Sequence, residues 1–282
     1  MDGQGTVSVI GFMQGRLSPP IGGQIQAFPW DHWRDEFPAA ARLGFSVMEW
    51  TLDDERLEDN PLMTAEGQRE IRSLAADHRI RIESVTGDFL IHASPVQVSG
   101  AERERRVGRL ARVIDACGAL GISRLVWPLV DRGRLTRPDQ EEALAGAVEH
   151  VTPRLSAAQV RIAFESDYAP ATLARLIGRF PADIAGINYD TGNSASLGFC
   201  ATDEMAAYGS RVVNLHIKDR LLGGPTVPLG AGAADFAMVF RALRGIGYSG
   251  PYILQTARAA DGDHAGALCR YRETVRHWIS VS

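Results

Sequence analysis

The chain has 282 residues, of which 45% are hydrophobic, and this predicts a single α/β barrel domain spanning residues 1–282. Its net charge of −4 and isoelectric point near 6.0 offer no basic surface, so neither nucleic acid nor an anionic membrane is an expected partner. The first residues carry no basic segment of the kind that directs export, and Cys117, Cys200 and Cys269 form no paired motif. We therefore expect a cytoplasmic protein that acts on a small molecule.

Eight short apolar runs bounded by turn residues predict strands at 7–13, 45–50, 81–89, 124–130, 160–166, 185–191, 212–219 and 251–256. Segments with helical spacing lie between them, among them 102–120, 140–155, 172–180, 236–246 and 265–279. Repeated strand and helix units require parallel strands, and eight of them in this length predict a (β/α)₈ TIM barrel. The first run is not followed by G-x-G-x-x-G, which argues against dinucleotide binding. Residues 221–232, rich in Gly and Pro, predict a long loop over the active site.

Polar residues interrupt several apolar runs near their C-terminal ends, where a barrel of this kind places its catalytic groups. They are Glu49, Glu165, Asp190, His216, Lys218 and Gln255. Taken singly, each is more often a structural polar group than a ligand. Together, two carboxylates, an imidazole and an amide oxygen from four consecutive strands suit a divalent cation with positions left open for substrate oxygens.

Four motifs carry a family resemblance: Gly11-Phe-Met-Gln-Gly-Arg-Leu-Ser18, Phe164-Glu-Ser166, Asn188-Tyr-Asp-Thr-Gly-Asn193 and Asn214-Leu-His-Ile-Lys-Asp-Arg220. Through them essentially the whole chain resembles the xylose-isomerase-like superfamily of TIM barrels, in particular sugar-phosphate isomerases/epimerases, a group that includes ketose 3-epimerases, inosose dehydratases and isomerases, and hydroxypyruvate isomerases. The resemblance implies a homo-oligomer and a sugar or polyol-derived substrate. It also implies a divalent metal (Mn²⁺, Mg²⁺, Co²⁺ or Zn²⁺) held by Glu165, Asp190, His216 and Gln255.

Two positions depart from the pattern of that family. Relatives normally carry glutamate where this chain has Gln255, and many carry a substrate-contacting histidine near the position of Asn193. Because glutamine cannot accept a proton, the departure disfavours epimerisation by two opposed carboxylates and predicts a weakly held metal.

Lys218 is the only lysine among the 30 basic residues of the chain. It lies two positions after His216, so both side chains are expected on the same face of their strand. A compact ammonium cannot be replaced by a guanidinium where it must donate to an oxyanion or lose a proton. We therefore expect a catalytic role for Lys218, although a single lysine can also remain by chance.

Further polar residues near strand ends are candidates for binding substrate hydroxyls or a phosphate: Arg16, Glu49, Asp88, His92, Asn193, Arg220 and Arg258. The alternative for each arginine is a solvated charge on the rim of the barrel.

The expected reaction is metal-assisted proton transfer next to a carbonyl, through an enediolate, with Glu165 as the base and Lys218 facing developing negative charge. Three alternatives remain. The first is a dehydratase, since the same enediolate can expel a β-hydroxyl. The second is a sugar-binding barrel that has lost its chemistry, which Gln255 supports. The third, an apurinic-site endonuclease, is disfavoured by the acidic charge and by histidines that lie mostly away from strand ends.

Overall fold

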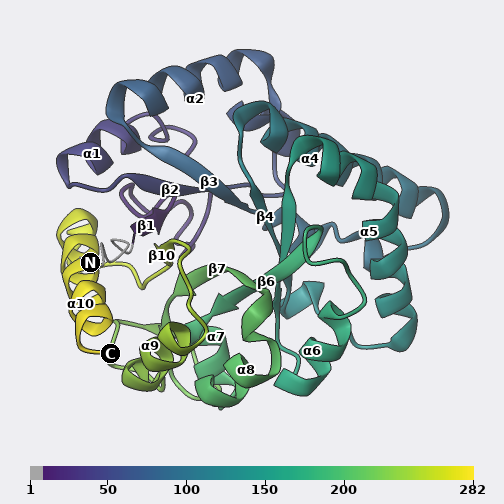
Figure 1. The fold of residues 1–282 in the computed structure, drawn as a ribbon. Coiled ribbons are helices and arrows are strands. Elements are labelled where there is room, and N and C mark those ends of the chain that lie inside the picture. Colours follow the sequence, from purple (N-terminus) through teal and green to yellow (C-terminus); the bar gives the residue numbers. More distant parts are fainter. Residues whose placement is uncertain (1–8) are drawn as a thin grey trace, which may run out of the picture.

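The computed structural model describes residues 9–282, in which eight parallel strands close into a barrel in the order β1-β10-β7-β6-β5-β4-β3-β2 (Figure 1). The barrel strands are β1 (Ile10–Met13), β2 (Val47–Thr51), β3 (Arg81–Thr86), β4 (Arg124–Leu129), β5 (Arg161–Ser166), β6 (Ala185–Asp190), β7 (Val212–Ile217) and β10 (Tyr252–Leu254). The prediction of a (β/α)₈ barrel is confirmed.

Helices form a ring around the barrel, because each crossover returns the chain to the same end of the sheet (Figure 1). They are α1 (Glu36–Arg42), α2 (Ala65–His78), α3 (Phe89–His92), α4 (Gly100–Leu120), α5 (Pro138–Ala158), α6 (Pro170–Ile177), α7 (Thr191–Ser196), α8 (Ala201–Tyr208), α9 (Phe236–Gly245) and α10 (His264–Val281). Short 3₁₀ turns occupy Leu57–Asp59, Pro61–Met63, Pro95–Gln97, Asp131–Gly133 and Gly209–Arg211.

Most strand boundaries differ from the sequence expectation by one to three residues. The predicted first strand began at residue 7, and its first two residues lie outside the described part of the chain. The third strand ends at Thr86 rather than at residue 89, because the chain turns into α3 directly after Gly87, whose N–H still donates to Val126 of β4. The last strand ends at Leu254, so Gln255 follows the strand instead of belonging to it.

The loop expected at residues 221–232 is held by a small antiparallel pair, in which β8 (Asp219–Arg220) directly precedes the loop and β9 (Thr226–Val227) lies within it. The buried Asp219 carboxylate accepts hydrogen bonds from the backbone N–H groups of Gly230, Gly232 and Ala234. A carboxylate that accepts several backbone N–H groups organises a loop strongly, so this segment is a defined hairpin rather than an open loop.

The two sides of the barrel wall are packed differently. Outside, a continuous apolar core joins the strands to the helices and includes Trp50, Trp127 and Phe164, all fully buried. Inside, a small apolar cluster of Met13, Val47 and Ile253 fills the barrel between its strands. Polar side chains, described with the site, also point into the barrel.

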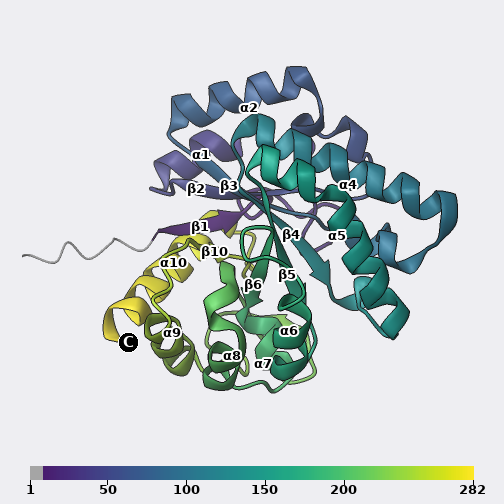
Figure 2. The ribbon, with the colours of Figure 1, turned by 45° about the vertical axis from the view of Figure 1, so that its right-hand side comes forward.

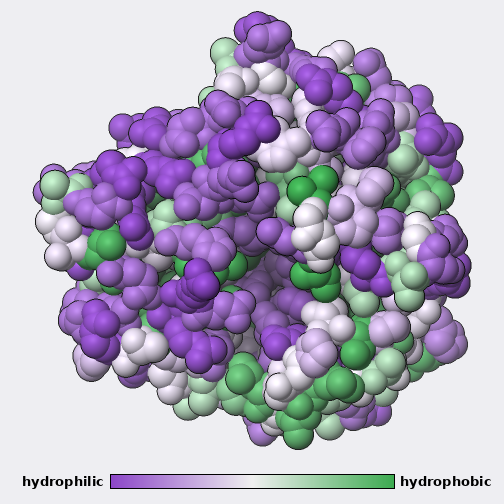
Figure 3. Space-filling model, turned by 180° about the vertical axis from the view of Figure 1, so that it is seen from behind, coloured by the Kyte–Doolittle hydropathy of each residue, from purple (hydrophilic) through white to green (hydrophobic). Residues whose placement is uncertain are grey.

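The strands run away from the viewer of Figure 1, as the turned view of Figure 2 shows for β1. The face seen from behind in Figure 3 is therefore the one on which the strands end, and hydrophilic side chains surround a hollow near its centre. In residues 9–282, no helix combines the length and the apolar character needed to cross a membrane.

Candidate active site

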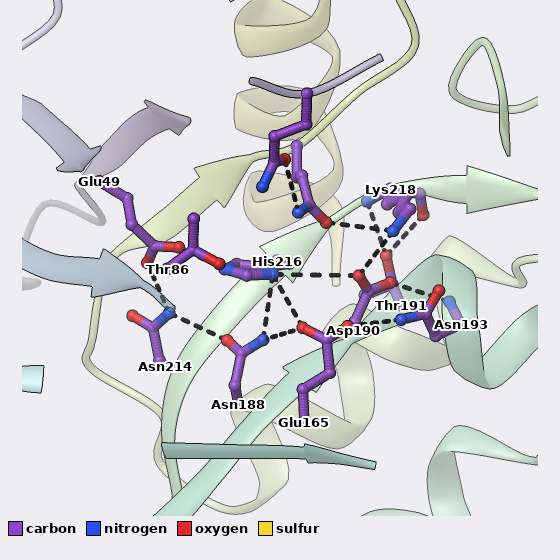
Figure 4. A network of polar contacts seen from close by, with 12 residues as sticks. Glu49, Thr86, Glu165, Asn188, Asp190, Thr191, Asn193, Asn214, His216 and Lys218 are labelled. Atoms are coloured by element: carbon purple, nitrogen blue, oxygen red, sulfur yellow. Dashed lines mark hydrogen bonds and ion pairs between the residues drawn. The ribbon is translucent and has the colours of Figure 1, made fainter. Parts of the chain in front are cut away.

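His216 on β7 occupies the centre of a buried polar network inside the barrel (Figure 4). Its Nε2 lies 2.7 Å from Glu49 Oε1, so the Nε2–H donates to that carboxylate. The Asn188 amide nitrogen, which can only donate, lies 3.0 Å from Nδ1. Both contacts favour the tautomer with its proton on Nε2, which leaves the lone pair of Nδ1 facing the strand ends.

Three ligand-type side chains converge at that lone pair. One ligand atom from each of Glu165, Asp190 and His216 lies within 4.8 Å of the others. Glu165 Oε2 is 3.2 Å and Asp190 Oδ2 is 3.9 Å from His216 Nδ1. All three side chains are buried, and two carboxylates beside one imidazole in a buried site favour a cation between them.

The histidine and the carboxylate behind it influence each other's ionisation. Burial lowers the pKa of His216, but the carboxylates of Glu49 and Glu165 outweigh it and raise the pKa to about 10. Burial would raise the pKa of Glu49, yet the charge of His216 and hydrogen bonds from His216, Ser84 and Asn214 bring it below its usual value. A site that stabilises a proton on Nδ1 also stabilises a metal cation there, so the two compete.

Asp190 and Glu165 are each oriented by the turn after β6. Asp190 Oδ1 accepts the backbone N–H of Asn193 and so caps α7, which leaves Oδ2 facing the cluster. The side-chain amide of Asn193 donates to Glu165 Oε1 at 2.6 Å, and its carbonyl oxygen accepts from Arg220. Asn193 and Arg220 therefore hold Glu165 in place in this structure, whereas the sequence suggested that both contact substrate.

Lys218, directly after β7, bridges the cluster to Gln255. Its Nζ lies 3.1 Å from Asp190 Oδ2 and 3.1 Å from Gln255 Oε1. The Gln255 amide nitrogen in turn donates to Gln26 Oε1 at 2.9 Å. These contacts orient the oxygen of Gln255 toward the cluster, so the structure brings together all five residues expected to bind metal or to catalyse.

Other expected substrate ligands serve the loop between β1 and α1 instead. Arg16 donates to the backbone carbonyls of Ile25 and Thr256 and to the Gln26 side chain, and it is only 3% exposed. Arg258 donates to the carbonyls of Ile25 and Ser18. Both arginines therefore fasten this loop over the end of the barrel through bonds to protein acceptors.

Glu49 has no exposed surface, and its oxygens are taken by His216, Ser84 and Asn214. The expectation that Glu49 contacts substrate is wrong for this structure. Glu49 is the middle residue of β2, so its side chain lies inside the barrel behind His216 rather than at the mouth.

Asp88 and His92 lie away from the cluster, at the start and the end of α3. They line a cavity of about 890 Å³ formed by the loops after β1, β2, β3 and β4, which we call the mouth cavity. Gln26 connects the two regions, because it lines the cavity, donates to Asp88 and accepts from Gln255.

Sequence reasoning missed Asn188, Asn214, Ser84 and Gln26. Asn188 lies two residues before Asp190, and Asn214 lies two residues before His216, so the alternation of a strand was a usable signal for both. Gln26 lies in a loop, where no such periodicity exists.

The comparisons with known proteins agree with this fold. The family model for the xylose isomerase-like TIM barrel matches residues 37–280. An L-ribulose-5-phosphate 3-epimerase UlaE from Salmonella paratyphi A is 30% identical, over 91% of this chain and 94% of that protein.

Solved structures of low sequence identity share the fold. A xylose isomerase domain protein from Planctomyces limnophilus has a TM-score of 0.75 at 16% identity, covering 96% of this chain and 97% of the other. An L-ribulose 3-epimerase has a TM-score of 0.74 at 15% identity, covering 97% and 95%. The match to the family model extends over most of the chain, and the chain belongs to the xylose isomerase-like TIM barrel family.

Proposed function

We propose that this protein is a metal-dependent sugar isomerase/epimerase that moves a proton next to the carbonyl of a sugar or a related hydroxy-carbonyl compound. The observation that carries the proposal is the convergence of Glu165 and Asp190 on Nδ1 of His216, whose other ring nitrogen is held by Glu49. The relative from Salmonella paratyphi A, named an L-ribulose-5-phosphate 3-epimerase, supports the same class of reaction.

The donor set fits a divalent cation. Glu165, Asp190 and His216 would each supply one atom, and the oxygen of Gln255 faces the same cluster through Lys218. Oxygen and imidazole ligands suit Mn²⁺, Mg²⁺, Co²⁺ or Zn²⁺. When bound, such an ion would polarise a substrate carbonyl and lower the pKa of the neighbouring C–H.

Glu165 is the proposed base. The side-chain amide nitrogens of Asn188 and Asn193 donate to its two oxygens at 2.7 Å and 2.6 Å. These two neutral donors fix the position of the carboxylate. A fixed carboxylate can take a proton from one carbon and return it to the adjacent carbon on the same face, which gives aldose–ketose isomerisation.

Lys218 occupies the side of the cluster where Gln255 replaces a glutamate. Its ammonium is 3.1 Å from the Gln255 oxygen, so it is the proton donor available at that position. There it would stabilise a developing enediolate oxygen. The same donor favours one further candidate, a dehydratase, because an acid beside the β-hydroxyl promotes loss of water.

The experiment is solvent exchange in D₂O with a panel of candidate ketoses, in the presence of chelator and after addition of Mn²⁺ or Mg²⁺. We expect deuterium at a carbon next to the carbonyl, inhibition by chelator and recovery with metal. Product mass separates isomerisation from loss of water. Undiminished exchange by a verified metal-free sample would refute metal dependence, and no exchange with any hydroxy-carbonyl compound would favour the sugar-binding alternative.

A further inference from the structure

The mouth cavity carries an excess of negative charge. Among the residues that line it are two arginines, Arg56 and Arg132, together with His92. Five carboxylates line it as well: Asp53, Asp54, Glu55, Asp88 and Asp131. A substrate whose carbonyl end lies at the Glu165 cluster would extend past Gln26 into this cavity, because Gln26 contacts both regions.

The cations nearest to the cluster are already bound to protein acceptors. Arg16 and Arg258 donate to loop carbonyls, Arg220 donates to Asn193 and Gly224, and Lys218 donates to Asp190 and Gln255. In the cavity itself, Arg56 lies over the ring of Trp30 and pairs with Asp59. A phosphate at the distal end of a substrate would have to break one of these contacts, or reach the exposed Arg132 at the edge of the cavity, to gain a bidentate partner.

Two half-buried carboxylates face the same space. Asp88 accepts from Gln26 and Thr86, and Asp53 accepts the backbone N–H of Phe28. Burial and the charge of Asp53 raise the pKa of Asp88 to about 6, so it is mostly ionised at neutral pH. A carboxylate next to a phosphate dianion in a partly desolvated cavity is repulsive, whereas a carboxylate accepts hydrogen bonds readily from hydroxyl groups.

Resting on the proposed function, we infer that the substrate is an uncharged polyhydroxylated carbonyl compound without a phosphate group, and that Asp88, Gln26 and Asp53 bind its distal hydroxyls. In this respect the chain differs from the relatives whose names specify a 5-phosphate. Asp88 would act as the specificity-determining residue. Its carboxylate would repel a phosphate, and it accepts a hydrogen bond from Gln26, which links the cavity to the cluster.

The experiment is calorimetric binding of ribitol and ribitol 5-phosphate to the full-length Mn²⁺-loaded protein, since alditols occupy a sugar site without reacting. We expect ribitol to bind on the order of tenfold more tightly than its phosphate, because two carboxylates repel the dianion. Asp88→Asn should bring the two dissociation constants several-fold closer together. The matched control Asp203→Asn removes the same charge from the exposed surface of α8 and should leave the ratio unchanged.

Tighter binding of the phosphate, especially if Arg132→Gln abolishes it, would overturn the inference and identify Arg132 as a phosphate ligand. Failure of both ligands to bind would overturn it as well. Selective binding of ribitol together with no solvent exchange on any ketose would instead leave the inference standing and refute the proposed catalysis.

Discussion

The inside of the barrel and the layer between barrel and helices are equally buried and chemically opposite. The outer layer is a continuous apolar core in which Trp127, Phe164 and Leu144 are fully covered. Beside its small apolar cluster, the interior instead holds Glu49 and His216 in a hydrogen-bonded network without exposed surface. Burial of apolar area stabilises the outer layer. The polar interior gains little free energy of folding from burial, because its buried polar atoms need hydrogen-bond partners. Substitutions should therefore separate stability from function by region.

The largest effect is expected for Glu165→Gln, which removes the proposed base from the interior. Loss of a general base lowers turnover by about 10³-fold, and the amide should alter the thermal unfolding midpoint only modestly. Solvent-deuterium exchange measures the first quantity and circular dichroism the second. Turnover within a few-fold of the wild type would show that another group takes the proton.

Leu144→Ala tests the outer layer. Leu144 is fully buried on α5, and truncation there should lower the free energy of unfolding by about 3 kcal/mol. Urea denaturation measures this loss, while kcat of the folded fraction should stay within twofold. A large decrease in kcat in fully folded Leu144→Ala protein would contradict the expectation that the outer layer affects stability and not function.

Lys218→Arg should lower turnover roughly 30- to 100-fold, because a guanidinium fork cannot replace a point donor. The space is also limited, since the stem of Lys218 packs directly against Gly192. Steady-state kinetics beside a thermal melt would show that the loss exceeds any loss of stability. An unchanged kcat would indicate that Lys218 has a structural role only.

Glu49→Gln should weaken Mn²⁺ binding about 10- to 100-fold, as loss of a carboxylate behind a histidine ligand does in other metal sites. Titration calorimetry measures the affinity. The matched control is Glu204→Gln, a buried glutamate that accepts from Tyr189, Ser194 and Tyr208 but does not touch His216. It should reduce stability and leave Mn²⁺ affinity unchanged. An equal decrease in Mn²⁺ affinity in both variants would indicate a general effect on folding.

The smallest change is expected for Gln255→Glu, which adds one carboxylate to the cluster. Mn²⁺ should bind about tenfold more tightly, because the new ligand carries charge, and 3-epimerase activity toward a free ketose should appear or rise. The amide donor to Gln26 is lost, so the loop after β1 is expected to loosen. If the wild type already epimerises efficiently and this variant changes nothing, Gln255 does not occupy the second base position.

Much of this molecule follows from local sequence. Eight apolar runs predicted the barrel, and interruption of those runs by Glu165, Asp190 and His216 predicted where polar groups gather, because parallel strands all end on one face. The alternation of a strand also accounts for His216 and Lys218 facing the same cluster. These features depend only on the periodicity of apolar residues along the chain and on the shared direction of the strands.

The tertiary structure decided the roles that depend on distant partners. Glu49 and His216 are 167 residues apart, and only closure of the barrel places one behind the other. Gln26 reaches Gln255 across 229 positions through a loop whose path Arg16 and Arg258 hold. Such contacts depend on strand register, loop return and competition for hydrogen-bond acceptors, and these are settled only when the whole chain has packed.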